Sequence, residues 1–489
     1  MLNIYFSDSV QVSADDVDNY GAFNVSLIGD LPLFIDPFLL FNSRLPKYRQ
    51  LHDQIIQYVR FLRDKAVEGG VTPGLLKAWY MFPEVKQTWL GYSLTGNKGR
   101  GLGPDFGKAL NRNLNTIFAS FGSEKVAHGS HLEKLCLIKD GVGKDNISDF
   151  ATNLIKDFLL DYTQEFARST VGPDFRRVLT VNKVRFNYDT ESWEDDRFEL
   201  PYVNGDYVLL IPKDILTKDD VWINKSDLLN DYEQIASGVP NNQLRQQIGN
   251  YFEKVLPKEP TRKEVNAAIA KVYQEFPELI EYYIRFKEEN GQSAQALSDL
   301  KVSESERLYV RQVVEFAAAL QKATGFYSVQ GNTYDEARAR VKFLKDVIEN
   351  KGGYRIFYLD GKPIGREEDA QILFRLTWFA TPSDVSREVN DGRGPVDFKI
   401  SRGSSDKALV EFKLASNTQL RKNLENQVEI YKKASDAERA IKVIVFFSDA
   451  QRERAMAILR DLGIEKSPDI VLIDARADNK PSASKATSH

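Results

Sequence analysis

The C-terminal third of the chain carries the most regular pattern of apolar and polar positions. Short apolar or alternating segments bounded by turn residues predict strands at 384–389, 396–400, 408–414, 441–447 and 470–473. Apolar residues at helical spacing predict helices at 367–379, 421–433 and 450–462. The order α-β-β-β-α-β, followed by α-β, predicts a mixed α/β sheet with helices on its faces.

A helix and a hairpin are predicted just before this order. Thr333-Tyr-Asp-Glu336 matches a capping box, and helical spacing then continues to Gly352-Gly353, where a helix would end. A strand is predicted over 354–359 and is closed by the turn Asp360-Gly361.

The rest of the chain divides by pattern into further regions. Residues 1–255 are expected to form a mixed α/β recognition or regulatory region, with strands at 31–40, 178–188 and 205–212 and helices at 52–65 and 146–166. Residues 256–325 are expected to form a helical linker region, with helices over 264–289 and 304–323. The domain with the regular pattern spans 326–475, and 476–489 has the composition of a disordered tail.

Composition is that of an ordinary globular protein and limits the classes of function. The 489 residues suggest two to four domains at roughly 150 residues each. Hydrophobic residues make up 42% and the net charge is −4, so any nucleic-acid surface must be local. Cys136 is the single cysteine, which excludes an intramolecular disulfide. No signal peptide and no apolar run of about 18 residues is present, so a cytoplasmic protein is expected.

Charged residues interrupt two of the predicted apolar strands. In the strand over 408–414, Glu411 and Lys413 share a face and stand about 7 Å apart. The loop over 401–406 is short enough for a hairpin, which would bring Asp397 beside Glu411. Two neighbouring carboxylates repel unless a cation lies between them, and oxygen ligands suit Mg²⁺ or Mn²⁺. The pattern predicts metal-assisted phosphodiester hydrolysis; the alternative is a cross-strand salt bridge on a solvated face.

These residues resemble the PD-(D/E)XK, or restriction-endonuclease-like, nuclease superfamily. Asp397 is followed after thirteen residues by Glu411-Phe412-Lys413, and Pro395-Val-Asp397 stands where the family has Pro-Asp, with one residue inserted. The α-β-β-β-α-β order is similar to that family's core. Gln427-Val-Glu-Ile-Tyr431 resembles the Gln-x-x-x-Tyr element of RecB-like members. The resemblance covers about 150 of the 489 residues.

The resemblance implies roles for individual residues. Asp397 and Glu411 would be metal ligands, Lys413 the catalytic lysine, and Gln427 would orient the site. The family also implies an acidic residue on the first core helix, for which Glu367, Glu368 and Asp369 compete. Glu368 is preferred, since it shares a helical face with the apolar residues Ile372, Leu376 and Phe379. Glu388 is a further candidate. The implied cofactor is Mg²⁺, with Mn²⁺ as a substitute.

A local excess of positive charge suggests where nucleic acid would bind. Residues 393–433 contain nine Lys or Arg against five Asp or Glu. The candidate contacts are Arg393, Arg402, Arg421, Lys422 and Tyr431, together with Lys98 and Arg100 in the glycine-rich segment 91–104. Each has a plainer alternative: Arg393 could anchor a turn, Gln427 and Tyr431 could be a helical i,i+4 pair, and 91–104 could be a surface loop. His128 and His131, near Glu133, lack enough ligands for a metal site.

The leading hypothesis is therefore a metal-dependent nuclease; DNA is favoured over RNA and an endonuclease over an exonuclease, and the sequence leaves both choices open. Fold-level analogy suggests a restriction or phage-defence effector, with a homodimer or a defence protein as partner and no membrane. One alternative is a catalytically silent nucleic-acid-binding or scaffold protein that keeps the nuclease-like fold. A third hypothesis is a nucleotide-responsive protein that uses the segment 91–107. Most phenylalanines and tyrosines are expected in the core.

Overall fold

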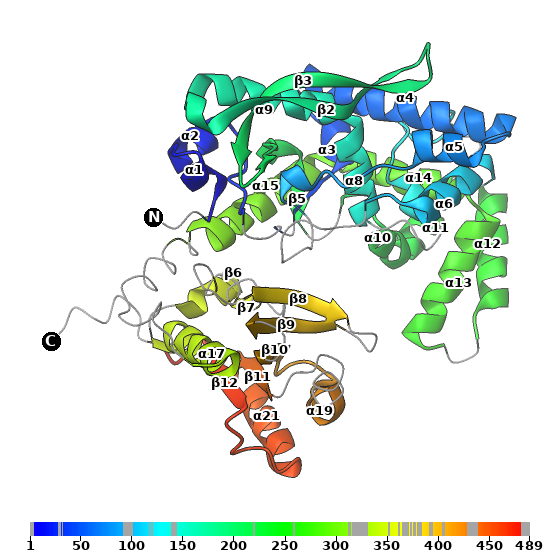
Figure 1. The fold of residues 1–489 in the computed structure, drawn as a ribbon. Coiled ribbons are helices and arrows are strands. Elements are labelled where there is room, and N and C mark those ends of the chain that lie inside the picture. The colour runs from blue at the N-terminus through cyan, green and yellow to red at the C-terminus, as the bar shows by residue number, and fades with distance from the viewer. Residues whose placement is uncertain are drawn as a thin grey trace, which may run out of the picture. The chain divides into compact units, whose positions relative to one another are not determined.

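A computed structural model provides the fold of the chain (Figure 1). It describes residues 4–27, 31, 33–90, 101–116, 118, 121–137, 144–218, 221–257, 260–311, 314, 331–350, 353–359, 362–363, 371, 374, 378, 384–390, 395–402, 406–427 and 439–480. The chain divides into two compact units, the first ending at Ser305 and the second beginning at Glu306. None of the helices in these ranges is long and apolar enough to cross a membrane.

The first unit combines many helices with one long β-hairpin. Its described helices are α1 (Phe6–Ser9), α2 (Ala14–Asn19), α3 (Pro37–Phe41), α4 (Pro46–Glu68), α5 (Pro73–Leu75), α6 (Pro104–Asn115), α7 (Lys134–Leu137), α8 (Lys144–Leu154), α9 (Lys156–Thr170), α10 (Lys225–Asn230), α11 (Tyr232–Ser237), α12 (Asn242–Val255), α13 (Arg262–Glu275), α14 (Glu278–Glu289) and α15 (Gly291–Glu306). Short π- or 3₁₀-helical turns lie at Leu76–Tyr80, Lys86–Thr88, Pro173–Phe175 and Lys213–Ile215. The strands are β1 (Leu33–Ile35), β2 (Arg176–Asn187), β3 (Ser192–Val203), β4 (Asp206–Tyr207) and β5 (Leu216–Lys218).

The β2–β3 hairpin packs along α9 and carries an irregularity in β2. The antiparallel register shifts between Val181 and Arg185, and Lys183 within this bulge has a positive φ of 54°. One face of the hairpin packs on α9 through a buried apolar cluster that contains Leu160, Val181, Val184, Phe198 and Leu200. Figure 1 shows the hairpin lying along α9. The hairpin is therefore anchored by its apolar face.

Several predictions for this unit are confirmed and others differ. The helix over 52–65 lies within α4, and the strand over 178–188 corresponds to β2. The single helix expected over 146–166 is two helices, because Ile155 leaves helical geometry at φ −106° and ψ 17°. Of the strand expected over 31–40, Leu33–Ile35 is extended, and Asp36 caps a helix that begins at Pro37. The strand expected over 205–212 is reduced to β4.

The helices between 262 and 306 group with the first unit, whereas the sequence suggested a separate linker region over 256–325. Buried hydrogen bonds account for this grouping. The Tyr283 hydroxyl on α14 donates to the Asn224 carbonyl at 2.8 Å, and the Ser298 hydroxyl on α15 donates to the Leu216 carbonyl. The helix expected over 264–289 is interrupted at Phe276 and Pro277, and α15 begins well before the predicted residue 304.

The second unit is an α/β domain built on a five-stranded mixed sheet. Its described helices are α17 (Thr333–Asn350), α19 (Leu420–Lys422) and α21 (Asp449–Asp461), with π- or 3₁₀-helical turns at Arg307–Arg311, Gly353–Phe357 and Asn423–Gln427. The strands are β6 (Tyr358–Leu359), β7 (Lys362–Pro363), β8 (Asp384–Asn390), β9 (Pro395–Arg402), β10 (Asp406–Leu414), β11 (Arg439–Phe446) and β12 (Ile470–Asp474). The five strands predicted for this sheet are thus confirmed.

The sheet combines antiparallel and parallel pairing. Its order is β12-β11-β10-β9-β8. β8, β9 and β10 pair antiparallel, as a meander does, whereas β10, β11 and β12 pair parallel. Because β10 joins both kinds of pairing, it lies at the centre of the sheet and both of its faces are largely buried. β6 and β7 form a separate short hairpin.

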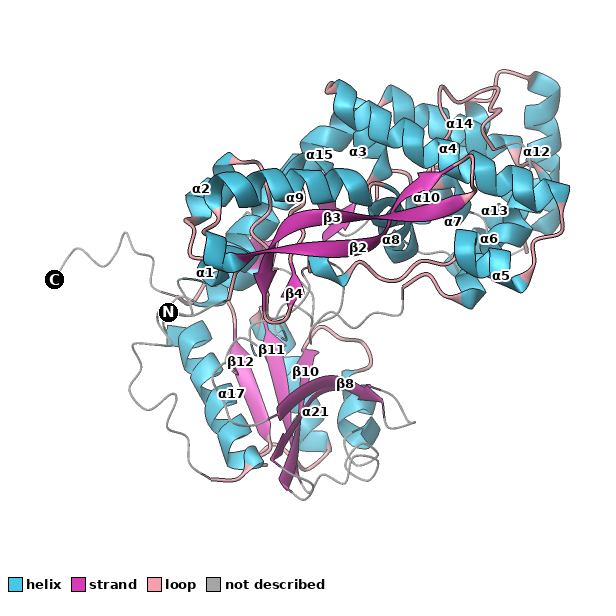
Figure 2. Ribbon diagram, turned by 45° about the horizontal axis from the view of Figure 1, so that its top comes forward, coloured by secondary structure: helices cyan, strands magenta, loops and turns pink. Residues whose placement is uncertain are grey.

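Helices cover both faces of this sheet. α17 packs along β9, β10, β11 and β12, and Figure 2 shows it running beside β12. Arg340 of α17 lies over the Trp378 ring at 4.7 Å, and Trp378 packs on Phe374, whose ring centroid is 5.1 Å from that of Phe412. α21 packs on β11, where Leu459 joins a buried cluster with Ile444 and Phe446. Ile444 pairs with Lys413, which follows Phe412 in β10, and consecutive residues of a strand point to opposite faces. α17 and α21 therefore cover opposite faces of the sheet.

Other predictions for the second unit need correction. Asn332, not Thr333, caps α17: its Oδ1 accepts from the Asp335 N–H at 2.9 Å. The Thr333 hydroxyl donates instead to Asp406 at 2.7 Å. The strand expected over 354–359 is a 3₁₀ turn followed by β6. Within the helix expected over 367–379, Gln371 and Phe374 are helical. The helix expected over 421–433 corresponds to α19 and the π-helical turn, and its part beyond Gln427 lies outside the described residues.

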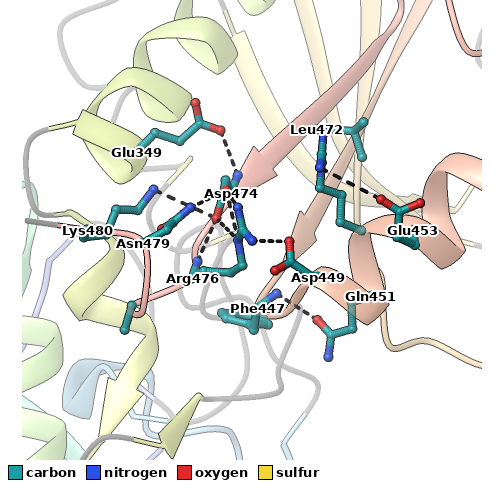
Figure 3. Close-up of polar contacts among 12 residues, drawn as sticks. Glu349, Phe447, Asp449, Gln451, Glu453, Leu472, Asp474, Arg476, Asn479 and Lys480 are labelled. Atoms are coloured by element: carbon teal, nitrogen blue, oxygen red, sulfur yellow. Dashed lines mark hydrogen bonds and ion pairs between the residues drawn. The ribbon is translucent and has the colours of Figure 1, made fainter.

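The segment 476–480 is part of the packed second unit, although the sequence suggested that disorder begins at 476. Arg476 donates to both carboxylate oxygens of Asp474 and forms an ion pair with Asp449 in the first turn of α21 (Figure 3). The Asp474 N–H donates to Glu349 of α17 at 2.8 Å. The side chain of Arg476 thus ties this segment to β12 and α21. Residues 481–489 lie outside the described residues.

Candidate active site

Charged side chains form a row across three central strands of the second unit. The register of β9 and β10 pairs Ile400 with Ala408 and Phe398 with Val410, so its continuation places Asp397 opposite Glu411. The parallel register of β10 and β11 pairs Glu411 with Lys442. Cross-strand neighbours share a face of a sheet. Asp397, Glu411 and Lys442 therefore stand in one row, and Lys413 follows two residues along β10 on the same face.

Asp397 is held in place by the backbone of the neighbouring strand. Its Oδ2 accepts a hydrogen bond from the Phe412 N–H at 2.6 Å. The carboxylate thus binds within the gap between β9 and β10, next to Glu411. A hydrogen bond to an ionised acceptor is about twice as strong as one between neutral groups. The contact fixes the position of one candidate ligand before any metal binds.

Glu411 is a buried carboxyl beside a lysine. Its Oε1 lies 3.4 Å from Lys413 Nζ, with 8% of the Glu411 side chain and 14% of the Lys413 side chain exposed. The pKa of Glu411 is raised to about 7, because burial and the Asp397 carboxylate, which raise it, outweigh Lys413 and Lys442, which lower it. Lys413 Nζ also donates to the Phe412 carbonyl at 2.9 Å. Carboxyls perturbed by burial and by a specific charged partner are typical of functional sites.

Lys442 is a site residue that the sequence analysis missed. Its Nζ donates to the Leu424 carbonyl at 2.6 Å, so it joins the charged row to the turn that carries Gln427. A signal was present, because Lys442 interrupts the apolar run Ile441-Lys-Val-Ile-Val445 as Glu411 interrupts β10. Its pairing with Glu411 depends on a parallel register that local sequence does not reveal.

The opposite face of the same strands is aromatic. The Phe374 ring centroid lies 5.0 Å from that of Phe398 and 5.1 Å from that of Phe412, and the rings meet edge-on or tilted. Phe412 thus anchors the strand on one side while Glu411 and Lys413 face the other, which explains the alternation in Glu-Phe-Lys. The two-sided burial makes this stretch of β10 rigid.

Two carboxylates among the described residues are available to a metal. No group of three or more His, Cys, Asp or Glu side chains comes together within the described part of the chain. Mg²⁺ is commonly held by one or two carboxylates, with waters and substrate phosphates completing its shell. Asp397 and Glu411 fit this requirement: they are oxygen donors on adjacent strands, and their mutual repulsion contributes to the raised pKa of Glu411.

The remaining predicted site residues divide into three groups. Arg402 donates to the Gly331 carbonyl at 2.7 Å and forms an ion pair with Glu336, so its guanidinium is engaged in anchoring α17. Arg421 is half exposed and pairs with Glu425 and Asp461, and Lys422 is exposed. The residues outside the description are Glu367, Glu368, Asp369, Arg393, Tyr431, Lys98 and Arg100, together with the side chain of Gln427.

The histidines noted in the first unit do not gather around Glu133. His131 Nε2 lies 2.9 Å from Glu288 Oε1, and Glu288 also accepts from the His128 and Gly129 N–H groups. Glu133 is fully buried, and its pKa is raised well above the usual range by burial and by Asp36. These contacts tie a loop to α14. Of the glycine-rich segment 91–104, residues 91–100 lie outside the description.

Two protein-family models match parts of the chain. Residues 333–449 match the model of a domain of unknown function (DUF8371), and this range contains the whole charged row. Residues 11–224 match the model of another domain of unknown function (DUF8370). No curated protein and no solved structure matches the chain.

Proposed function

We propose that the chain is a metal-dependent nuclease whose active site is the charged row of the second unit. The observation that carries the proposal is the alignment of Asp397 and Glu411 on adjacent central strands, with Lys413 at 3.4 Å from Glu411. The resemblance to PD-(D/E)XK nucleases implies this arrangement. It also implies an α-β-β-β-α-β order, and the successive strands β8, β9, β10 and β11 support this order.

In the proposed reaction, Asp397 and Glu411 would hold Mg²⁺, which when bound would activate water and polarise a phosphodiester. The Phe412 N–H keeps the Asp397 carboxylate oriented. Lys413 would donate to an oxygen on which negative charge develops in the transition state. Lys442 offsets negative charge at Glu411 and helps to keep it ionised near neutral pH.

A third carboxylate ligand has two candidates. The resemblance implies Glu368, which lies outside the described residues. The register of β8 with β9 pairs Arg387 with Phe398 and Val389 with Val396, and so places position 388, a glutamate, level with Asp397. Two single variants, one with each glutamate replaced by glutamine, would show which of the two residues affects metal binding.

Cleavage assays on full-length protein test the proposal. DNA and RNA panels would be incubated with Mg²⁺, Mn²⁺ or EDTA, with DNA expected as the substrate. Glu411→Gln and Lys413→Met should each lower cleavage about 10²-fold or more, as expected for groups that stabilise the transition state. The matched controls Glu465→Gln and Lys466→Met lie on an exposed loop and should cut like wild type.

Three outcomes separate the alternatives. Metal-dependent cutting that both site variants lose supports the nuclease and identifies the polymer. Failure of folded wild type to cut with either metal would overturn it in favour of the silent binding or scaffold protein. That alternative is favoured by one observation: Lys413 lies 3.4 Å from Glu411, an ion pair that balances this carboxylate without a metal. Cutting that survives in both site variants would mean that the active site lies elsewhere.

A further inference from the structure

A cavity of about 220 Å³ lies in the first unit, between α4, the start of α9 and the β2–β3 hairpin. It is built where the bulge in β2 changes the strand register, just before Arg185 and Phe186. Bulges re-aim side chains and are enriched next to functional sites. The residues of interest here are Tyr58, Phe186 and Trp193 on its walls and Gln54, Gln57 and Arg185 at its rim.

The walls form a rigid aromatic platform. The ring centroids of Tyr58 and Trp193 lie 5.3 Å apart, those of Tyr58 and Phe186 4.9 Å, and those of Phe186 and Trp193 5.4 Å. The Trp193 indole N–H donates to the Tyr58 hydroxyl at 3.2 Å, which fixes the indole plane. Tyr58 is buried, whereas Phe186 and Trp193 are half-buried and leave ring surface facing the cavity. Such surface stacks on planar rings of any base.

The rim supplies hydrogen-bonding groups that match the edge of a base. Gln54 and Gln57 lie three residues apart on α4, and both are exposed. Within the described part of the chain, neither carboxamide makes a hydrogen bond. A carboxamide carries a donor and an acceptor side by side, which is the pattern that a base edge presents. Two such groups beside aromatic rings form a polar, orienting side to the cavity.

The charge at the rim argues against a site built for phosphate. Arg185 is half exposed, but it pairs with Asp196 at 3.1 Å and with Asp157 at 3.7 Å. A phosphate would have to compete with two carboxylates for this guanidinium. The cavity is also small, at about 220 Å³. The space suits one planar ring system, with sugar and phosphate left outside.

We propose that this cavity binds a nucleobase, held by the rings of Phe186 and Trp193 and by the carboxamides of Gln54 and Gln57. The base comes either from a free nucleotide or from an unpaired position in nucleic acid, and the chemistry of recognition is the same for both. This inference goes beyond the proposed nuclease and does not depend on it, since the site lies in the first unit and binding requires no cleavage.

Calorimetric titration of the full-length protein in EDTA tests the proposal without any contribution from catalysis. The probes are the common mononucleotides, a short single-stranded oligonucleotide, the same strand with abasic positions, and a duplex. Binding of mononucleotides identifies a free nucleotide as the source. Binding of the single strand with loss on the abasic strand identifies an unpaired base. Because phosphates contribute little, affinity should depend only weakly on salt.

A double variant supplies the second arm of the test. Gln54→Ala with Gln57→Ala should weaken binding about tenfold or more, as expected for losing bidentate contacts to a base edge. Gln243→Ala with Gln246→Ala is the matched control, because these exposed glutamines have the same spacing on α12, away from the cavity. The proposal is overturned if folded wild type binds none of the probes, if no mononucleotide binds and the abasic strand binds as well as the intact one, or if the two double variants bind alike.

Discussion

The second unit should become less stable as pH rises, because Glu411 must lose its proton in the folded state. Replacing Glu411 with glutamine should make the stability of this unit nearly independent of pH in this range. Burial raises the pKa of Glu411 from 4.5 to about 7, against the opposing charges of Lys413 and Lys442. The folded state therefore holds a proton that the unfolded chain has released between these values. The stabilisation is complete below the ordinary pKa and is lost as pH rises through about 7. At 1.36 kcal/mol per tenfold change in proton affinity, the loss amounts to about 3 kcal/mol.

The measurement has to follow the second unit alone, because two compact units need not unfold together. Full-length protein in EDTA would be equilibrated in urea at a pH just below the ordinary Glu411 pKa of 4.5 and at mildly alkaline pH, and then pulse-labelled with deuterium at one common pH. Peptides from β10 report the unfolding of its sheet. Wild type and the exposed control Glu465→Gln should lose about 3 kcal/mol between the two conditions, and Glu411→Gln should lose little. If wild type and Glu411→Gln lose stability in parallel, Glu411 does not titrate as argued.

Two further predictions concern buried charges. Glu133→Gln should stabilise the first unit at alkaline pH and change it little at acid pH, because burial and Asp36 raise the Glu133 pKa and deprotonation then leaves a buried charge. Urea denaturation at both pH values checks this, and equal stability at alkaline pH would contradict it. Lys442→Met should destabilise the second unit by about 1–3 kcal/mol, since the Leu424 carbonyl loses its donor. Lys442→Met should also raise the Glu411 pKa, because the Lys442 charge lowers it, whereas Lys442→Arg keeps this charge and should leave the pKa nearly unchanged. The β10 pulse-labelling assay, repeated at several pH values, distinguishes the two variants.

The strands of the second unit could be predicted from the sequence because their signals are local. Each is an apolar or alternating run between turn residues, and the short loop before Asp406 sets the register of β9 and β10. The helix boundaries that failed depend on distant partners. Thr333 matches a capping box by sequence, but its hydroxyl donates to Asp406, and the side chain of Asn332 caps the helix instead. The break at Ile155 is followed by the buried Lys156, whose Nζ donates to the Asn182 carbonyl in β2.

The same distinction separates the parts of the site. Asp397, Glu411 and Lys413 lie on two strands joined by a short hairpin, so spacing alone brings them together. Lys442 reaches Glu411 only through a parallel crossover, whose register depends on how β11 packs. The base-sized cavity combines α4, α9 and a bulged hairpin, and no local pattern predicts that these elements meet. The sequence pattern thus predicts which residues a hairpin brings together, but not which residues meet through tertiary packing.

The balance of charge in the row bears on how the proposed reaction would proceed. Among the described residues, the carboxylates of Asp397 and Glu411 are matched by the ammonium groups of Lys413 and Lys442, so the formal charge of the row is zero when all four are ionised. A bound divalent cation would make it doubly positive, in a setting where burial weakens screening. A phosphodiester, with its single negative charge, would then lower the net charge to one positive and supply the oxygen ligands that two carboxylates leave open. In the proposed reaction, cation and substrate would therefore favour each other's binding, and the site would be weakly occupied by metal until nucleic acid is present.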